Sequence, residues 1–245
     1  MRWLKNLFFS TLKILSAVIL TPLACGLSAA LYISVAQYFN ITTLLPFLLG
    51  FGLYLLIYAI LQQPIRTYIF THELVHVIWV LIFGGKVKDF RMGKRGGSVK
   101  VSKTNFIIEL APYLFPLYCI ISILVYFMAG LFIDVKPYWK VMSFVVGFFW
   151  AFHFTITAYV LTKEQTDFRG PGVVLSLVIV YIFNVIILAL IICFLSDSVS
   201  FKTYAVNSID KALICYKALY STCYKIWMES IKWLENIKQC FWLAG

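Results

Sequence analysis

Apolar residues are arranged along this chain in long runs that are separated by short polar breaks. Six runs stand out, near residues 14–38, 43–61, 66–84, 106–133, 139–162 and 172–195. A helix needs about 20 apolar residues to cross the hydrocarbon core of a bilayer, and each run approaches or exceeds that length. The breaks between them contain the polar, proline and glycine residues that end helices. The pattern predicts an all-α polytopic membrane protein with about six transmembrane helices.

The N-terminal residues 1–26 combine a positive start with an apolar stretch, as a secretory signal does. The apolar stretch continues to Phe39, which is too long for the hydrophobic region of a signal. We therefore expect this segment to form the first transmembrane helix rather than a cleaved leader.

The segment between the third and fourth runs, residues 86–105, differs sharply from its surroundings, because it carries seven basic side chains and a single acid, Asp89. Val99 and Val101 alternate with polar residues, and the glycine-rich stretch 93–97 could form a turn. This pattern predicts a short β-hairpin. A solvated charged loop fits the same composition equally well, so both interpretations are open.

Residues 199–245 have a different composition from the rest of the chain. Apolar residues recur there at helical spacing, at Ile209, Leu213, Tyr216, Tyr220, Cys223, Trp227, Ile231 and Leu234. Most of the lysines fall away from this stripe, which predicts an amphipathic helix that lies on the membrane surface or on a partner helix. We therefore divide the chain into a membrane domain, residues 1–198, and a C-terminal tail, residues 199–245.

Composition narrows the classes of protein that the chain can belong to. With 62% hydrophobic and 13% charged residues in 245 positions, it has too many apolar side chains to bury in a soluble globule. Lys and Arg together number 21 against 10 Asp and Glu, and basic residues beside apolar runs contact anionic lipid head groups. The sequence contains no motif for nucleic-acid recognition. We expect a multi-pass protein of a bacterial-type cell membrane whose partner is the lipid bilayer, with its orientation open.

All three histidines of the chain lie inside predicted spans, where ionisable groups are costly and mark functional sites. Two of them form the pattern His72-Glu73-Leu74-Val75-His76. Residues four apart share a helix face, so both imidazoles can bind one Zn²⁺ ion. Glu73 lies about 100° further round the helix, where its carboxylate can act as the general base on a zinc-activated water. A buried histidine pair that hydrogen-bonds to neighbouring helices is the simpler alternative.

The motif supports more than one function. Zinc and Glu73 together would hydrolyse a peptide bond, which makes the chain a zinc-dependent endopeptidase. The same histidines could serve a non-proteolytic metal-binding membrane protein, either a transporter or an inactive homologue. A membrane scaffold that acts through the tail helix would need no metal.

Residues 66–180 resemble the site-2 protease-like, M50 group of intramembrane zinc metallopeptidases. The resemblance rests on HELVH, on Phe83-Gly84-Gly85-Lys86-Val87 and the expected hairpin, on the run ELAPYLFPLY, and on Gln165-Thr166-Asp167. It implies hydrolysis of a peptide bond in or near a transmembrane segment of a membrane-protein substrate. It further implies that Asp167 is the third zinc ligand and that the hairpin, with Val99 and Val101, binds an extended substrate segment. The N-x-x-P-x-x-P-L-D-G motif that usually surrounds this aspartate in the family is absent.

Membrane depth favours a different third ligand. If the helices alternate in direction, HELVH and Asp167 lie near opposite membrane faces, whereas His153 lies closer in depth to the histidine pair. His153 could therefore complete a three-histidine site, or it could be an ordinary core histidine, and Asp167 could be a surface acid. Pro112 and Pro116 break the start of the fourth run beside Glu109, which could leave backbone groups free to hold substrate. We count Pro112 as a candidate substrate contact for that reason.

Overall fold

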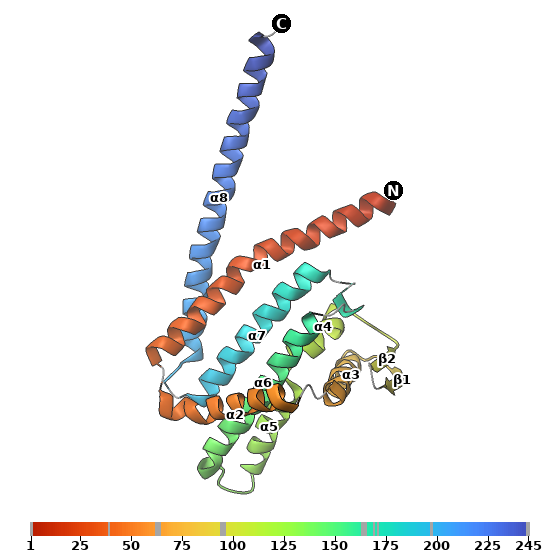
Figure 1. Cartoon of the computed structure of the whole chain (residues 1–245), viewed down its shortest axis with the longest axis vertical. Coiled ribbons are helices and arrows are strands. Elements are labelled where there is room, and N and C mark those ends of the chain that lie inside the picture. The colour runs from red at the N-terminus through yellow and green to blue at the C-terminus, as the bar shows by residue number, and fades with distance from the viewer. Residues whose placement is uncertain are drawn as a thin grey trace.

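The computed structural model describes residues 2–38, 40–61, 65–93, 97–162, 166–168, 170, 172–196 and 198–243. These residues form helices with a single β-hairpin among them (Figure 1). The elements are α1 (Arg2–Tyr38), α2 (Ile41–Leu61), α3 (Ile65–Ile82), β1 (Val87–Met92), β2 (Gly97–Val101), α4 (Phe106–Leu114), α5 (Leu117–Ala129), the 3-10 turn η1 (Lys136–Tyr138), α6 (Trp139–Leu161), the 3-10 turn η2 (Thr166–Phe168), α7 (Val173–Leu195) and α8 (Phe201–Leu243). The helical fold class predicted from the apolar runs is confirmed.

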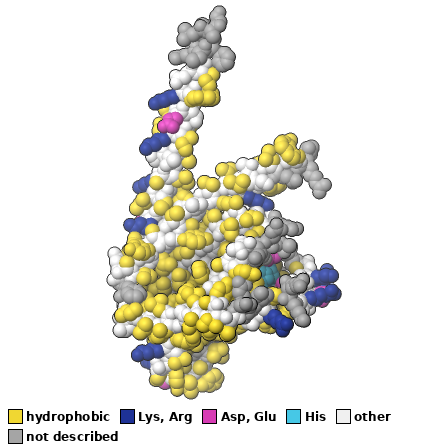
Figure 2. Space-filling view, viewed as in Figure 1, with side chains coloured by type: hydrophobic (Ala, Val, Ile, Leu, Met, Phe, Trp, Pro, Cys, Tyr) yellow, Lys and Arg dark blue, Asp and Glu magenta, His cyan; other side chains and the backbone are white. Residues whose placement is uncertain are grey.

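Four helical segments are long and apolar enough to cross a membrane: Leu7–Gln37, Ile41–Leu61, Lys136–Leu161 and Val173–Leu195. Helices of this kind suggest a protein embedded in a membrane. Hydrophobic side chains are spread over the visible face of the bundle in Figure 2, as expected of a surface that contacts lipid. The pair α4 and α5 adds a fifth crossing if it counts as one broken span. The predicted number of six is not reached among the described residues, because α3 does not qualify.

The break between α4 and α5 bends the predicted span 106–133 by 72°. Its cause is Pro116, which lacks a backbone N–H and disfavours a helical conformation at the preceding residue, so that Phe115 is extended with φ −110° and ψ 110°. The carbonyl of Tyr113, near the broken end, accepts a hydrogen bond of 2.9 Å from the Asn184 side chain of α7. Irregular backbone inside a helix bundle needs such a partner.

The helices pack in two directions. In Figure 1, α1, α6 and α7 run roughly alongside one another, whereas α3 is seen nearly end-on beside the hairpin and so crosses them steeply. α2 packs along α6. Their backbones approach closely at Gly50 and Gly147, where a Cβ atom would collide with the Phe144 carbonyl and the Phe47 carbonyl respectively. The steep crossing of α3 determines how its histidines face the bundle.

The predicted hairpin is present, so the charged-loop alternative is wrong. β1 and β2 pair antiparallel, with Val87 opposite Val101 and Phe90 opposite Val99. Both strands lie against α3. Residues 94–96 of the expected turn lie outside the described residues.

The predicted tail helix is also present as α8. It packs against α1 at its start and then projects away from the rest of the molecule (Figure 1). The side chains buried there are Tyr204, Ser208 and Ala212, while Leu213 of the predicted apolar stripe stays about half exposed. Of the predicted stripe, Tyr216 does reach α1, because its hydroxyl donates a hydrogen bond of 2.8 Å to the carbonyl of Ile19. Residues 220–230 are all exposed.

Candidate metal centre

His72 and His76, the two histidines of HELVH, lie on the same face of α3, and their imidazole rings converge. Their Nε2 atoms lie 3.2 Å apart. The Oδ2 atom of Asp167 lies 3.3 Å from Nε2 of His72 and 3.8 Å from Nε2 of His76. In the described part of the chain, these three residues form the one cluster of three or more potential metal ligands.

The spacing of these three atoms fits a zinc ion. Ligand atoms at 2.0 to 2.1 Å from a tetrahedral zinc lie about 3.4 Å from one another. The three observed distances, 3.2, 3.3 and 3.8 Å, lie close to that value. Two imidazoles and one carboxylate also match the ligand set of catalytic zinc sites, in which a fourth position stays open. The residues present therefore fit a zinc ion in both chemistry and spacing.

Hydrogen bonds on the far side of each ring orient the histidines. Nδ1 of His76 lies 2.8 Å from the carbonyl oxygen of Ile108, which can only accept, so Nδ1 carries the proton and donates it. In the neutral ring, the form that binds a metal, the lone pair is therefore on Nε2, which faces the cluster. Nδ1 of His72 lies 2.9 Å from the hydroxyl of Tyr68, one helical turn earlier on α3. Partners of this kind fix the tautomer and the ring orientation of metal-binding histidines.

Asp167 reaches the cluster from η2, which follows α6. The Tyr113 hydroxyl donates a hydrogen bond of 2.8 Å to Oδ2, the same oxygen that faces the imidazoles. Burial alone would raise the pKa of the Asp167 carboxyl, but hydrogen bonds and positive charge from His72 and His76, when their rings are protonated, outweigh burial and hold that pKa well below its usual range. The carboxyl is therefore ionised, as a metal ligand must be.

The segment that carries Asp167 is held in place from two sides. Lys13 of α1 donates a hydrogen bond of 2.6 Å from Nζ to the carbonyl of Gly170. On the other side, the carboxylate of Glu109 packs so closely on Gly170 that a Cβ atom there would lie 2.5 Å from Oε2. Glu109 thus supports the aspartate-bearing segment and is not one of the three clustered residues. Gln165, part of the same sequence motif, lies outside the described residues.

Glu73 lies beside the histidine pair on the flank of α3 that faces the hairpin. It is buried, with 9% of its surface exposed. Gly97, the first residue of β2, packs directly against it, and a Cβ atom at Gly97 would lie 2.6 Å from Cγ and 2.8 Å from Oε1 of Glu73. Only glycine leaves the carboxylate this room. Glu73 is thus positioned by the hairpin and is not a member of the ligand cluster.

His153, the alternative third ligand, is not part of the cluster. Its Nε2 atom pairs with Oδ1 of Asn184 on α7 at 3.2 Å, and the ring is buried in α6. The expectation that Asp167 lies too far away failed because it assumed a simple alternation of helices. α3 crosses the bundle steeply and α4–α5 is broken, so counting spans does not give the depth of either residue.

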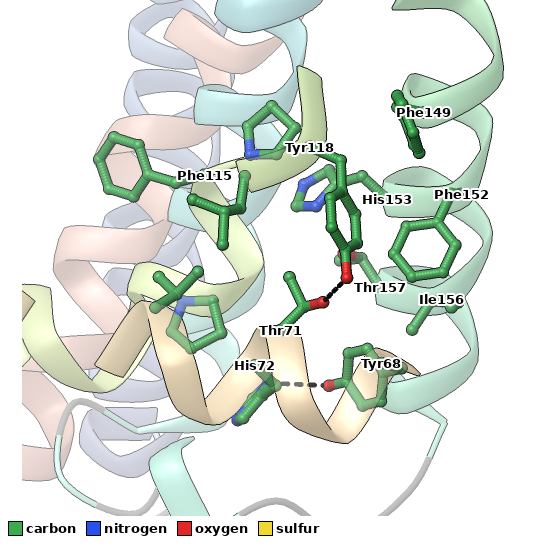
Figure 3. A pocket seen from close by; sticks show the side chains of 14 residues that line it. Tyr68, Thr71, His72, Phe115, Tyr118, Phe149, Phe152, His153, Ile156 and Thr157 are labelled. Atoms are coloured by element: carbon green, nitrogen blue, oxygen red, sulfur yellow. Dashed lines mark hydrogen bonds between the residues drawn. The ribbon is translucent and has the colours of Figure 1, made fainter. Parts of the chain in front are cut away.

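The candidate substrate contacts lie on two sides of the centre. Val99 and Val101 are partly exposed in β2. In the two-stranded sheet each strand has one unpaired edge. Pro112 is buried in α4 and lines a pocket that also includes His72 and His153 (Figure 3).

Several residues of the site carry little signal in the sequence. Tyr68 could have been found, because it precedes His72 by four positions and so shares its helix face. Tyr113, Asn184 and Lys13 are isolated polar residues in apolar runs, and their partners lie far away along the chain.

Comparisons of this chain with models of known protein families, with curated proteins and with solved structures found no match.

Proposed function

We propose that this protein is a zinc-dependent endopeptidase that hydrolyses a peptide bond in or near a transmembrane segment of a membrane-protein substrate. The observation that carries the proposal is the convergence of His72, His76 and Asp167, with the buried carboxylate of Glu73 on the adjoining flank of the same helix. The resemblance of residues 66–180 to the site-2 protease-like peptidases supports the same reaction. The four apolar helices support a substrate that also lies in the membrane.

His72, His76 and Asp167 would hold the metal. Bound zinc would supply Lewis acidity, which makes water a nucleophile near neutral pH and polarises the scissile carbonyl. Tyr68 and the Ile108 carbonyl orient the two imidazoles that would bind the ion, and Tyr113 keeps the carboxylate of Asp167 in place. These partners make the site rigid before substrate binds, as efficient catalysis requires.

Glu73 would move the protons of the reaction. Its carboxylate accepts a proton from the attacking water as the new C–O bond forms, and it donates that proton to the amine nitrogen as the C–N bond breaks. A carboxylate with little exposure to solvent is a stronger base than a solvated one, because burial disfavours its charged form. Its close contact with Gly97 limits the positions that the carboxylate can take.

The hairpin would hold the substrate in an extended form. A helical substrate keeps its peptide bonds hydrogen-bonded internally, so the helix must open before hydrolysis. An unpaired strand edge can hydrogen-bond to an extended segment. β2 begins against Glu73, and it carries Val99 and Val101, which makes it the better placed of the two strands.

Removal of the metal tests the proposal directly. The full-length protein in detergent, incubated with a library of quenched fluorescent peptides, should hydrolyse some members, and a chelator such as 1,10-phenanthroline should lower the rate by at least about 100-fold. Added zinc should restore it. Activity that survives chelation in protein shown to be metal-free would contradict the proposal, and zinc binding without hydrolysis of any peptide or membrane protein would favour a non-proteolytic metal-binding role.

Replacement of Gly97 by alanine tests the positioning of Glu73. The added Cβ atom would lie within 3 Å of the carboxylate side chain, which must then move. Because displacement of a catalytic group by about 1 Å can cost 100-fold, we expect Gly97→Ala to lower the rate by about tenfold to 100-fold with unchanged zinc content. Gly52→Ala is the matched control, since a Cβ atom there meets nothing within 4 Å. Equal rates for the two variants would show that the hairpin does not position Glu73.

A further inference from the structure

A pocket lies directly beside the candidate metal centre, and His72 forms one of its walls (Figure 3). It is enclosed by α3, by the broken junction of α4 and α5, and by α6. The empty space amounts to about 370 Å³, which includes the part that is open to the outside. Of the residues that line this pocket, His72, Tyr68 and Pro112 have a role in the chemistry described so far, and the others have none.

The pocket offers mainly apolar surface. Most of its wall consists of aliphatic and aromatic side chains, among them Val75, Phe115, Tyr118, Phe149, Phe152 and Ile156. Several of its polar groups are already bonded: Thr71 Oγ1 donates to the Tyr118 hydroxyl at 2.9 Å, and His153 pairs with Asn184. Apolar pockets with few polar groups are typical binding sites for apolar ligands.

The position of the pocket relative to Glu73 is set by the geometry of α3. Successive helical residues are rotated by about 100°, so Thr71 and Val75 lie on one flank of the histidine pair and Glu73 lies on the other. β2 follows on the Glu73 side through Gly97. A peptide segment that crosses in front of the histidines therefore has the hairpin on one side and the pocket on the other.

We infer that this pocket binds a branched aliphatic side chain of the substrate, of about the size of leucine, at a position next to the scissile bond. We choose this size because the empty space of about 370 Å³ is an upper limit that includes the open part, and aromatic rings from α5 and α6 narrow the pocket. The inference rests on the proposed function for the identity of the ligand. The adjacency of pocket and metal can be tested without any hydrolysis.

Two hydroxamates serve as probes, because the hydroxamate group chelates zinc and its substituent explores the neighbouring space. The full-length, zinc-loaded protein is titrated calorimetrically with acetohydroxamic acid and with 4-methylpentanohydroxamic acid. Burial of the branched substituent should make the second compound bind at least about tenfold more tightly. Equal affinities for the two compounds overturn the inference and leave the metal centre intact. A protein that retains no zinc overturns the metal centre, and the inference with it.

Variants of α6 test whether the branched substituent of the hydroxamate binds in this pocket. Thr157→Phe fills the pocket and should remove the tenfold advantage while acetohydroxamic acid binds as before. Ala158→Phe, at the next and exposed position, should keep the advantage. If Thr157→Phe also weakens the binding of acetohydroxamic acid, a second variant, Ile156→Ala, tests the inference. This substitution enlarges the pocket, so the variant should bind 3-phenylpropionohydroxamic acid several-fold more tightly than the unaltered protein does. An advantage that persists in an intact Thr157→Phe protein, or no change in Ile156→Ala, overturns the inference.

Discussion

Glu73→Gln should abolish hydrolysis while leaving the zinc in place. Glutamine keeps the shape of the side chain, so its packing against Gly97 is preserved. It cannot accept a proton from water, and loss of a general base typically costs 10²- to 10⁴-fold in rate. We expect a decrease of about 1,000-fold or more. Because Glu73 does not belong to the ligand cluster, the zinc content of the purified variant should stay at the level of the unaltered protein.

Glu109→Gln is the matched control for that experiment. Glu109 is a second acid near the centre, but it packs on Gly170 and its Oε1 accepts a hydrogen bond of 3.3 Å from Thr104. Glutamine can still accept that bond, so the rate should change by less than about tenfold. If Glu73→Gln keeps its activity, the role of Glu73 as general base is wrong. If Glu73→Gln loses its zinc, the carboxylate takes part in metal binding instead.

The helices of the bundle could be predicted from the apolar runs alone. The runs 43–61, 139–162 and 172–195 match α2, α6 and α7 to within about two residues. Length and apolar composition decide these elements, since polar or helix-breaking residues limit the runs at both ends. The first apolar run was placed near residues 14–38, whereas α1 already begins at Arg2, since no proline or glycine interrupts residues 2–13.

The arrangement of those helices could not be predicted. Pro116 was recognised as a break, but its consequence, a bend of 72°, depends on the packing around it. The steep crossing of α3 and the return of η2 to the histidines depend on contacts between distant parts of the chain. One of these contacts joins Lys13 to Gly170, 157 positions apart. Local sequence carries no signal for such a pairing.

Part of the candidate site could likewise be predicted from local sequence, and part could not. His72, Glu73 and His76 follow from helical spacing, because residues four apart share a face in any helix. The role of Asp167 as third zinc ligand followed only from the resemblance to known peptidases, and the expected membrane depth of this residue favoured His153 instead. That expectation assumed a regular alternation of straight spans, whereas α4–α5, which lies between HELVH and Asp167 in the chain, is bent by 72°. Depth is a property of the fold and cannot be counted from the sequence where a span is interrupted.

Asp167→Asn should remove most of the zinc affinity. Asparagine keeps a carbonyl oxygen for the Tyr113 hydrogen bond but lacks the negative charge that binds the ion. Loss of a residue that only supports a ligand already costs tenfold to 100-fold in metal affinity, so loss of a ligand's charge should cost at least about 100-fold. Zinc competition with a chromophoric chelator measures this change in the purified protein.

His153→Ala provides the comparison, because His153 was the alternative third ligand. Its ring pairs with Asn184 and stays outside the cluster, so zinc affinity should remain within about threefold of the unaltered protein. The variant should nevertheless unfold at a lower temperature, since the partly buried amide of Asn184 loses a partner at a cost of about 1 to 3 kcal/mol. Stability and metal affinity should therefore separate: Asp167→Asn loses zinc, and His153→Ala loses stability. The opposite result, with zinc lost from His153→Ala and kept in Asp167→Asn, would make His153 the third ligand and require α6 to turn toward α3.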